Sequence, residues 1–171
     1  MYHLETERLN LRPLTHDDAE FIVELVNDPD WLRFIGDKNV HNRDDAIRYL
    51  DNGPLTMYRR YGLGLFAAEQ KSDGRLLGMC GLLRRDGLAH AAIGFAFLPS
   101  ARGQGYALEA AKAVLKHARE VLKLDTVLAI TTLNNELSIK LLRKLGLSDA
   151  GELKLPGSEE RLKLFEIRWA S

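Results

Sequence analysis

Short apolar runs in the middle of the chain are bounded by residues that favour turns. The three runs cover residues 65–69, 76–83 and 89–98, and they are separated by Asp73-Gly74 and Asp86-Gly87. An Asp-Gly pair between two apolar runs is a strong signal for a hairpin turn. The pattern therefore predicts an antiparallel meander of three strands.

The hydrophobic spacing changes to that of a helix from about Gly105 to Leu122. One face of this segment carries an apolar stripe, made of Ala107, Ala110, Ala111, Val114, Ala118, Val121 and Leu122. A strand over 126–131 follows, so the helix connects two strands and predicts that they are parallel neighbours. Ligands bind such sheets beyond the carboxyl ends of the strands, which directs attention to the loop 98–106.

The remaining pattern completes a mixed sheet. Thr15 to Asp18 resembles a capping box that begins a helix ending near Val26, and a second helix begins near Asn42 and is interrupted or restarted at Pro54. Further elements are strands near 9–13, 150–155 and 162–169 and a helix over 135–145. We predict an α/β (α+β) fold with about seven strands and four helices, forming one domain over residues 1–171.

Composition narrows the function classes. The chain has 171 residues, of which 46% are hydrophobic, and 24 Lys and Arg balance 24 Asp and Glu. A net charge of zero argues against nucleic acid or an anionic membrane as a partner. Cys80 is the only cysteine, so neither a disulfide framework nor a cysteine-based metal site is expected. No apolar run is long enough to span a membrane and no leader-like segment begins the chain, which predicts a cytoplasmic protein. No metal is expected either.

The loop after residue 98 has the features of an anion cradle. Gly103 and Gly105 allow the backbone to approach a ligand closely, the following helix supplies unpaired N–H groups, and Arg102 adds a cation. A dinucleotide-binding loop would need Gly or Ala where Leu108 stands, and a P-loop would need a Lys-Ser/Thr pair that is missing. A nicotinamide-dependent oxidoreductase therefore rests on the glycines alone, and a ligand-free tight turn is the other reading.

The segment Arg102-Gly103-Gln104-Gly105-Tyr106-Ala107 resembles the acyl-CoA loop of the GCN5-related N-acetyltransferases (GNAT family). The segments 4–14, 103–110 and 135–146 resemble the RimJ/RimL-like subgroup, which acetylates N-termini of ribosomal proteins. The blocks occur in the expected order along nearly the whole chain. The resemblance implies a sheet whose strands 89–98 and 126–131 splay apart to admit the pantetheine arm of acetyl-CoA.

The resemblance also implies a set of site residues. Phe95 and Phe97 would offer backbone groups to pantetheine, residues 102–107 would hold the pyrophosphate, and Asn135 and Ser138 would flank the thioester. Helix capping is an equally good reading for Asn135 and Ser138, and simple packing for Tyr106. The full cofactor-binding set is Phe95, Phe97, Leu98, Arg102, Gly103, Gln104, Gly105, Tyr106, Ala107, Asn135 and Ser138.

Two family positions depart from the usual residues. Many members have a Tyr as general acid where this chain has Leu142, and the subgroup often has a Glu where it has Ala92. Ser138 or an ordered water then becomes the candidate acid for the leaving thiolate. The general base stays unassigned, and water is one candidate. The histidines His3, His90 and His117 have no visible partner in the sequence and are weak alternatives.

The segment 28–37 between the first two helices is the candidate acceptor side. It combines aromatic with charged residues, and Trp31 and Phe34 could clamp an acceptor while Asp37 attracts its ammonium group. Core packing of the aromatics and a solvated turn are the competing reading.

We therefore expect an acetyl-CoA-dependent N-acetyltransferase that acts by direct transfer in a ternary complex. The acceptor would be a protein N-terminus or a small amine, and the enzyme a monomer or homodimer. The alternative is a non-catalytic acyl-CoA-binding module, suggested by Leu142 and Ala92.

Overall fold

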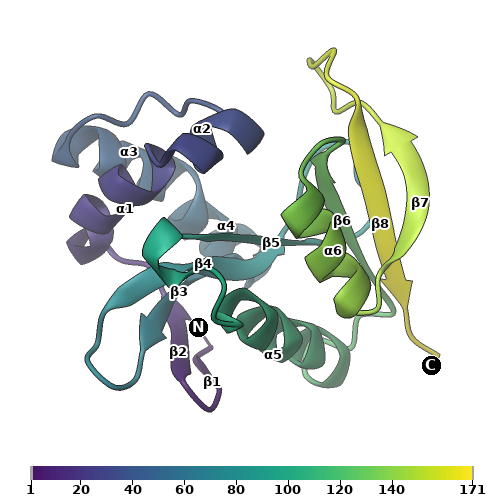
Figure 1. Cartoon of the computed structure of the whole chain (residues 1–171), viewed down its shortest axis with the longest axis horizontal. Coiled ribbons are helices and arrows are strands. Elements are labelled where there is room, and N and C mark those ends of the chain that lie inside the picture. The colour runs from purple at the N-terminus through teal and green to yellow at the C-terminus, as the bar shows by residue number, and fades with distance from the viewer. Residues whose placement is uncertain (1, 171) are drawn as a thin grey trace.

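The computed structural model describes residues 2–170, and its centre is one eight-stranded sheet (Figure 1). The strand order is β1-β2-β3-β4-β5-β6-β8-β7. The strands are β1 (Leu4–Glu5), β2 (Leu9–Pro13), β3 (Leu65–Gln70), β4 (Leu76–Leu83), β5 (Ala92–Phe97), β6 (Thr126–Thr132), β7 (Ser148–Leu153) and β8 (Leu162–Arg168). Within residues 2–170, no helix has both the length and the apolar character that crossing a bilayer requires.

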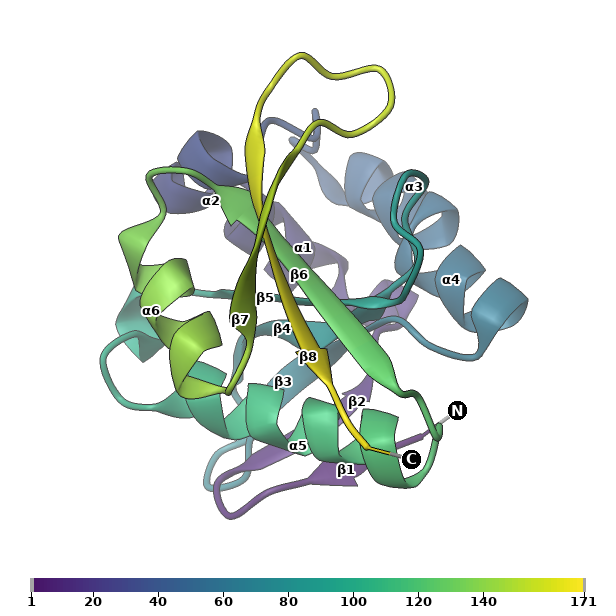
Figure 2. The same cartoon turned by 90° about the vertical axis from the view of Figure 1, so that its right-hand side faces the viewer.

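The meander of β3, β4 and β5 is antiparallel, as its two Asp-Gly turns predict. β5 and β6 are parallel, which confirms the crossover expected from the strand, helix and strand pattern. The last strand, β8, enters the sheet between β6 and β7 and is antiparallel to both. The segment between β7 and β8 projects beyond the sheet (Figure 2).

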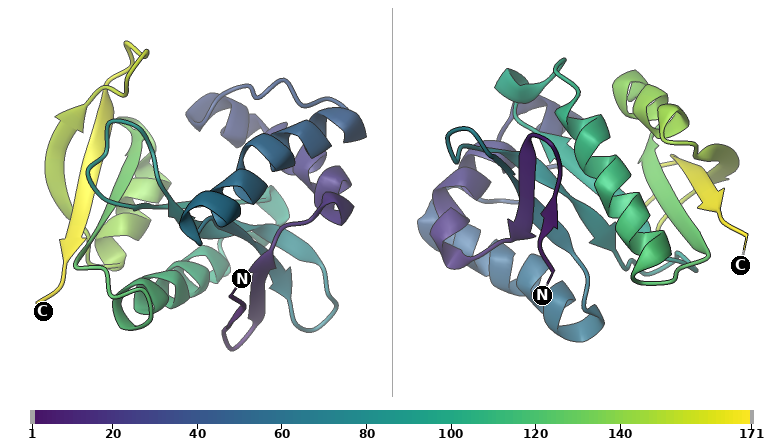
Figure 3. Two further views of the ribbon diagram at one scale, coloured as in Figure 1. Left: turned by 180° about the vertical axis from the view of Figure 1, so that it is seen from behind. Right: turned by 90° about the horizontal axis from the view of Figure 1, so that it is seen from below.

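Helices cover both faces of the sheet (Figure 3). The long helix α5 (Tyr106–Glu120) lies on one face because its stripe of Ala110, Ala111, Val114 and Ala118 is buried against the strands. α6 (Glu136–Lys144) joins the same core through Leu142. The other face is covered by α1 (Ala19–Val26), α2 (Pro29–Phe34), α3 (Arg43–Asn52) and α4 (Pro54–Tyr61).

Side chains that alternate along β3 and β4 contribute to two apolar cores, one on each face of the sheet. Ala68 and Cys80 belong to the core under α5, whereas Ala67 and Met79 belong to the core under α1–α3. Successive side chains of a strand point to opposite faces, so one strand serves two apolar layers. Cys80 packs as a small core residue, and its burial raises the pKa of the thiol.

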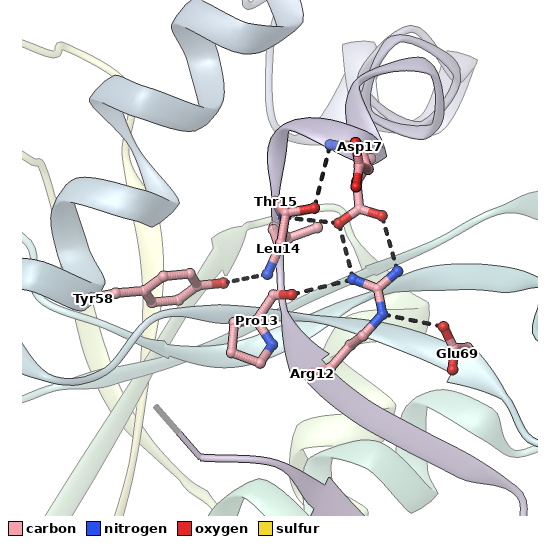
Figure 4. Close-up of polar contacts among 8 residues, drawn as sticks. Arg12, Pro13, Leu14, Thr15, Asp17, Tyr58 and Glu69 are labelled. Atoms are coloured by element: carbon pink, nitrogen blue, oxygen red, sulfur yellow. Dashed lines mark hydrogen bonds and ion pairs between the residues drawn. The ribbon is translucent and has the colours of Figure 1, made fainter.

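A polar network joins the start of α1 to the sheet (Figure 4). The guanidinium of Arg12 donates to both carboxylate oxygens of Asp18 at 2.9 and 3.0 Å and to Glu69 at 3.1 Å. Asp18 also accepts from the backbone of Thr15, so the expected capping box forms, around the short 3₁₀ turn His16–Asp18. The hydroxyl of Tyr58 donates to the carbonyl of Leu65 and accepts from the amide of Leu14. These bonds fix α1 and α4 against the strand end.

Two elements differ from the sequence prediction. The two-residue strand β1 is additional and brings the number of strands among residues 2–170 to eight. α2 lies inside the segment 28–37 that we expected to be a loop, because Asp28 caps it and Pro29 occupies its first turn. The restart that the sequence allows at Pro54 is confirmed, because α3 and α4 are separate helices with Gly53 between them. The fold class is otherwise as predicted.

Candidate active site

β5 and β6 part from one another soon after they begin to pair. The only residue pair in register between them is Ala92 and Leu128, beside a bond from the amide of Leu128 to the carbonyl of Ala91 at 2.9 Å. From Phe95 to Phe97 no strand partner lies on the β6 side. The sheet is therefore split toward the carboxyl ends of these two strands, as the family resemblance implies.

The split leaves backbone groups of β5 unpaired. The amide of Leu98 donates to the carbonyl of Leu77 in β4, so by alternation the backbone groups of Phe95 and Phe97 point to the opposite side, toward the gap. Leu98 was expected on the cofactor side, but its amide is already engaged and its side chain is buried in the core under α1. The free groups on this side are the amide and carbonyl of Phe95 and the amide of Phe97, because the carbonyl of Phe97 accepts from the guanidinium of Arg102.

A cavity of about 400 Å³ lies along this gap, between β5, the glycine loop, the start of α5 and α6. Most of the residues expected around the cofactor line it, together with Trp31 and Phe34. The predicted residues in its lining are Phe95, Phe97, Arg102, Gly103, Gly105, Tyr106, Ala107, Asn135 and Ser138. Gln104 does not line it, because its side chain donates to the carbonyl of Ser100.

The loop at 103–108 offers a run of free backbone donors. No amide of these six residues has an acceptor within the part of the chain that the structure describes. Gly103 and Gly105 have φ of +75° and +82°, which only glycine adopts readily, and this turns the amides toward one side before α5 begins. Free N–H groups together with the positive end of a fifteen-residue helix fit a pyrophosphate.

The N-terminal segment holds this loop in place. Arg8 donates to Glu109 at 2.7 Å and to the carbonyl of Gln104 at 2.9 Å, and Thr6 donates to Glu109 at 2.5 Å. Partial burial acts to raise the pKa of Glu109, but the bonds from Thr6 and Arg8 keep it below its usual value. The segments 4–14 and 103–110, which both resemble the family, are thus in contact, and the first holds the second in position.

Tyr106 is a packing residue in this arrangement. Its side chain is buried, the guanidinium of Arg8 lies 4.2 Å from the centre of its ring, and its hydroxyl accepts from Gln70 at 3.1 Å. The aromatic ring forms part of the cavity wall and its hydroxyl is already bonded.

Arg102 does not present a free cation to the loop. Its guanidinium donates to Asp28 at 2.7 Å, to Asp30 at 2.6 Å and to the carbonyl of Phe97 at 2.8 Å. Its charge is therefore neutralised by the start of α2, and the phosphate contacts are left to backbone amides. The contact ties α2 to the end of β5, so Arg102 positions one wall of the cavity.

We expect Arg102→Met to lower the free energy of unfolding by roughly 2–3 kcal/mol. The side chain of Asp28 is only 5% exposed and would lose its charged partner, a costly change for a buried carboxylate, while the 33% exposure of Arg102 moderates the loss. Urea unfolding measures it. Arg143→Met is the matched control, because that pair with Asp149 is half exposed and should cost below about 1 kcal/mol. Equal losses in the two variants would contradict the role given to Arg102.

A second cavity, of about 260 Å³, lies on the other side of the split, toward α3 and α4. The two cavities have seven lining residues in common, namely Trp31, Phe34, Ile35, Phe95, Ala96, Asn135 and Ser138. They therefore meet at the gap between β5 and β6. A ligand in one cavity can reach a ligand in the other at this point.

Asn135 and Ser138 lie at this meeting point, at the start of α6. The side chain of Asn135 accepts from the amide of Ser138 at 3.3 Å, so Asn135 is the cap of the helix. The hydroxyl of Ser138 has no hydrogen-bond partner among the described residues. The backbone amide of Ser138 is thus used in capping the helix, while its hydroxyl is left for a ligand.

The other candidate residues divide between the site and the surface. Trp31 and Phe34 line both cavities, and Trp31 is also buried in the core under α1, which confirms its packing role, while a clamp on an acceptor stays a prediction. Asp37 lines neither cavity, and its carboxylate accepts from the amide of Asn39, as in a solvated turn. No histidine in residues 2–170 lines either cavity, so His3, His90 and His117 lie outside the site.

Several residues that line the two cavities belong to no recognisable sequence motif, and the sequence analysis did not identify them. Lys140 and Lys144 of α6 border the first cavity, and Lys38, Tyr49 and Arg85 border the second. The only signal for Lys140 and Lys144 was their spacing of one helical turn. Lys38, Tyr49 and Arg85 come from three separate segments, and only the tertiary fold brings them together.

Comparison with known proteins identifies the family. The model of the acetyltransferase (GNAT) domain matches residues 8–148. The uncharacterised N-acetyltransferase YoaA of Bacillus subtilis is 28% identical over 155 residues, which cover 88% of this chain and 85% of YoaA.

Solved structures share the fold. An acetyltransferase from Agrobacterium tumefaciens superposes with a TM-score of 0.83 at 22% identity and covers 99% of this chain and 95% of its own. RimL, a ribosomal L7/L12 α-N-protein acetyltransferase solved with coenzyme A, superposes with a TM-score of 0.79 at 14% identity and 98% coverage of both chains. Together with the family match, which spans most of the sequence, these findings show that the chain belongs to the GNAT family and is an N-acetyltransferase.

Proposed function

We propose that this enzyme transfers the acetyl group of acetyl-CoA directly to a primary amine while both are bound. The observation that carries the proposal is the meeting of two cavities at the gap between β5 and β6. One cavity has the donors for a pyrophosphate, and the other is lined mainly by apolar residues. Such an arrangement suits two ligands that react where they touch.

The first cavity would hold acetyl-CoA, which supplies an activated acetyl thioester. Amides 103–108 would bind its pyrophosphate, with Lys140 and Lys144 adding positive charge at the rim. The free amide and carbonyl of Phe95 and the free amide of Phe97 would pair with the pantetheine arm as a strand would. The thioester end would then lie near Asn135 and Ser138.

The residues at the gap have separate tasks in the transfer. A backbone N–H of Phe95 or Phe97 would donate to the carbonyl oxygen as negative charge develops on it, and such a donor is worth about 3 kcal/mol. The hydroxyl of Ser138 would donate a proton to the leaving sulfur. Leu142 and Ala92 are buried at 2% exposure each, so neither offers a polar group. Water is then left as the acceptor of the proton from the amine.

The acceptor would be a protein N-terminus or a small amine. An α-amino group has an ordinary pKa of about 7.7–8.0 and is partly neutral near pH 7, whereas a lysine at about 10.4 is almost wholly charged. A site without a strong base therefore suits an α-amine. The fold shared with RimL keeps a protein N-terminus among the candidates.

The test is release of CoA from acetyl-CoA with a panel of small amines and N-terminal peptides. Release that depends on an acceptor supports the proposal. Tight acetyl-CoA binding without turnover of any acceptor would favour the non-catalytic module instead. Calorimetric titration with NADH should give no binding, which separates the enzyme from a nicotinamide-dependent oxidoreductase.

A further inference from the structure

The second cavity is cationic at its rim and has no acid in its wall. Lys38 precedes α3 and Arg85 follows β4, and both line this cavity. No Asp or Glu is among its lining residues, within the part of the chain that the structure describes. Neither Lys38 nor Arg85 has an ion-pair partner among residues 2–170. Two like charges left together without a counterion favour an anionic ligand.

Electrostatics agree with this placement. Desolvation of its ammonium and the neighbouring charge of Arg85 lower the pKa of Lys38. Burial raises the pKa of Tyr49 to about 12, so its phenol remains a neutral donor at physiological pH. The hydroxyl of Tyr49 has no hydrogen-bond partner among the described residues. Lys38, Tyr49 and Arg85 thus form a cluster of donors, which we call the rim cluster.

Deeper in the same cavity, two buried polar atoms lack a partner. They are Nε1 of Trp31 and Oγ1 of Thr132, and both residues line the cavity. A buried polar atom without a partner costs roughly 1–3 kcal/mol, but neither of these two atoms is accessible from the cavity, so they are not contacts for a ligand there. The donors that a ligand can reach at the rim of the cavity are therefore those of Lys38, Tyr49 and Arg85.

The nearby carboxylates do not reverse this charge. Asp28 and Asp30 line the first cavity and are bound by Arg102. Asp37 faces the amide of Asn39 in its own turn. None of these three carboxylates lines the second cavity or forms an ion pair with Lys38 or Arg85.

The geometry points to a small primary amine that carries an anionic group, a carboxylate or a phosphate, as the acceptor. This inference rests on the proposed function and narrows its substrate class. The anionic group would bind the rim cluster, an apolar body would lie against Met57, Met79 and Phe95, and the amine would reach the gap beside Ser138. A volume of about 260 Å³ lies just below the usual range for drug-sized ligands, about 300–1,000 Å³, and suits a molecule of amino-acid size.

The first experiment compares matched acceptors. CoA release would be measured with Phe, Leu, Met and Tyr, with their amides, with the phosphonate analogue of Phe, and with C-terminally amidated tetrapeptides without acidic residues. We expect kcat/KM for the best anionic acceptor to exceed that of its neutral amide by about tenfold or more, since charge-assisted bonds would be lost. Comparing kcat/KM for Phe with that for its phosphonate analogue shows whether the site prefers a carboxylate or a phosphate.

Variants then test whether the rim cluster is the cause. Lys38→Met and Arg85→Met together should reduce that preference to within about twofold. Arg84→Met is the matched control, because Arg84 is the exposed neighbour of Arg85 and lines neither cavity. It should leave the preference unchanged. Amides and neutral peptides that react as well as the amino acids would overturn the inference, as would a preference that survives in the double variant.

A binding measurement separates failure of this inference from failure of the proposed function. Calorimetry of N-acetylphenylalanine and of its amide, with CoA present, reports on the anion site without turnover. The acid should bind at least about tenfold more tightly, and the double variant should lose this difference. If no amine is turned over, the proposed function fails while this result still decides the anion site. Equal binding of acid and amide would overturn the inference even in an active enzyme.

Discussion

Gly105→Val is expected to weaken acetyl-CoA binding by about 100-fold or more. Gly105 has φ of +82°, where a β-branched residue is strongly disfavoured, and a Cβ there would lie 3.4 Å from the guanidinium of Arg8. Relief of this strain requires the loop to turn, which withdraws amides from the phosphates. Loss of two charge-assisted bonds, each worth about 1.5–3 kcal/mol, accounts for the expected change. Calorimetric titration with acetyl-CoA measures it.

Gly74→Val is the matched control for backbone strain. Gly74 has φ of +75° in the turn between β3 and β4, and a Cβ there would meet nothing within 4 Å. The variant should lower the melting temperature but leave acetyl-CoA affinity within about twofold. Unchanged affinity in a folded Gly105→Val variant would show that the loop does not bind the cofactor. An equal loss of affinity in both variants would mean that the effect is one of global stability.

Most of the sheet could be predicted from local patterns. Asp73-Gly74 and Asp86-Gly87 identify the meander, and the change in hydrophobic spacing near Gly105 identifies the crossover helix. These signals work because turn geometry and amphipathic spacing are properties of a few neighbouring residues. The fold and the family agree with them.

The missed elements lack such local signals. β1 has two residues and is held by pairing with β2, so no pattern of its own exists. Asn27-Asp28-Pro29 both ends α1 and begins α2, whereas the sequence prediction placed the end of a helix near Val26 and no new helix after it. The position of β8 between β6 and β7 is set by tertiary packing, and the residues of the strands themselves do not specify it.

The candidate site divides in the same way. The residues of the glycine loop and of β5 were found because their chemistry needs a contiguous segment. The ion pair of Arg102 was not found, because Asp28 and Asp30 lie more than seventy residues away in sequence. The rim cluster was missed for the same reason. A site built from one segment leaves a motif, whereas a pocket assembled by the fold leaves none.

The proton donor at the gap is the point on which the mechanism is most open to test. Ser138→Ala should lower kcat by about 10²–10⁴-fold, the usual contribution of general acid catalysis, with kcat/KM falling in parallel. Acetyl-CoA affinity should stay within about twofold, because the hydrogen bond that the backbone amide of Ser138 donates to the side chain of Asn135 does not involve the hydroxyl. Saturation kinetics and calorimetry measure the two quantities separately.

Ser138→Thr keeps a hydroxyl at the same position and should recover most of the lost rate. If Ser138 only supports the start of α6, Ser138→Ala should instead cost about 0.5–2 kcal/mol of stability with little change in turnover. Thermal melting of both variants separates these two roles. The free hydroxyl of Ser138 lies where the two cavities meet, whereas Leu142 and Ala92 are buried and apolar, so the side chains at those positions cannot replace it. A fall in kcat of less than about threefold, with chemistry shown to be rate-limiting, would therefore assign the proton to water.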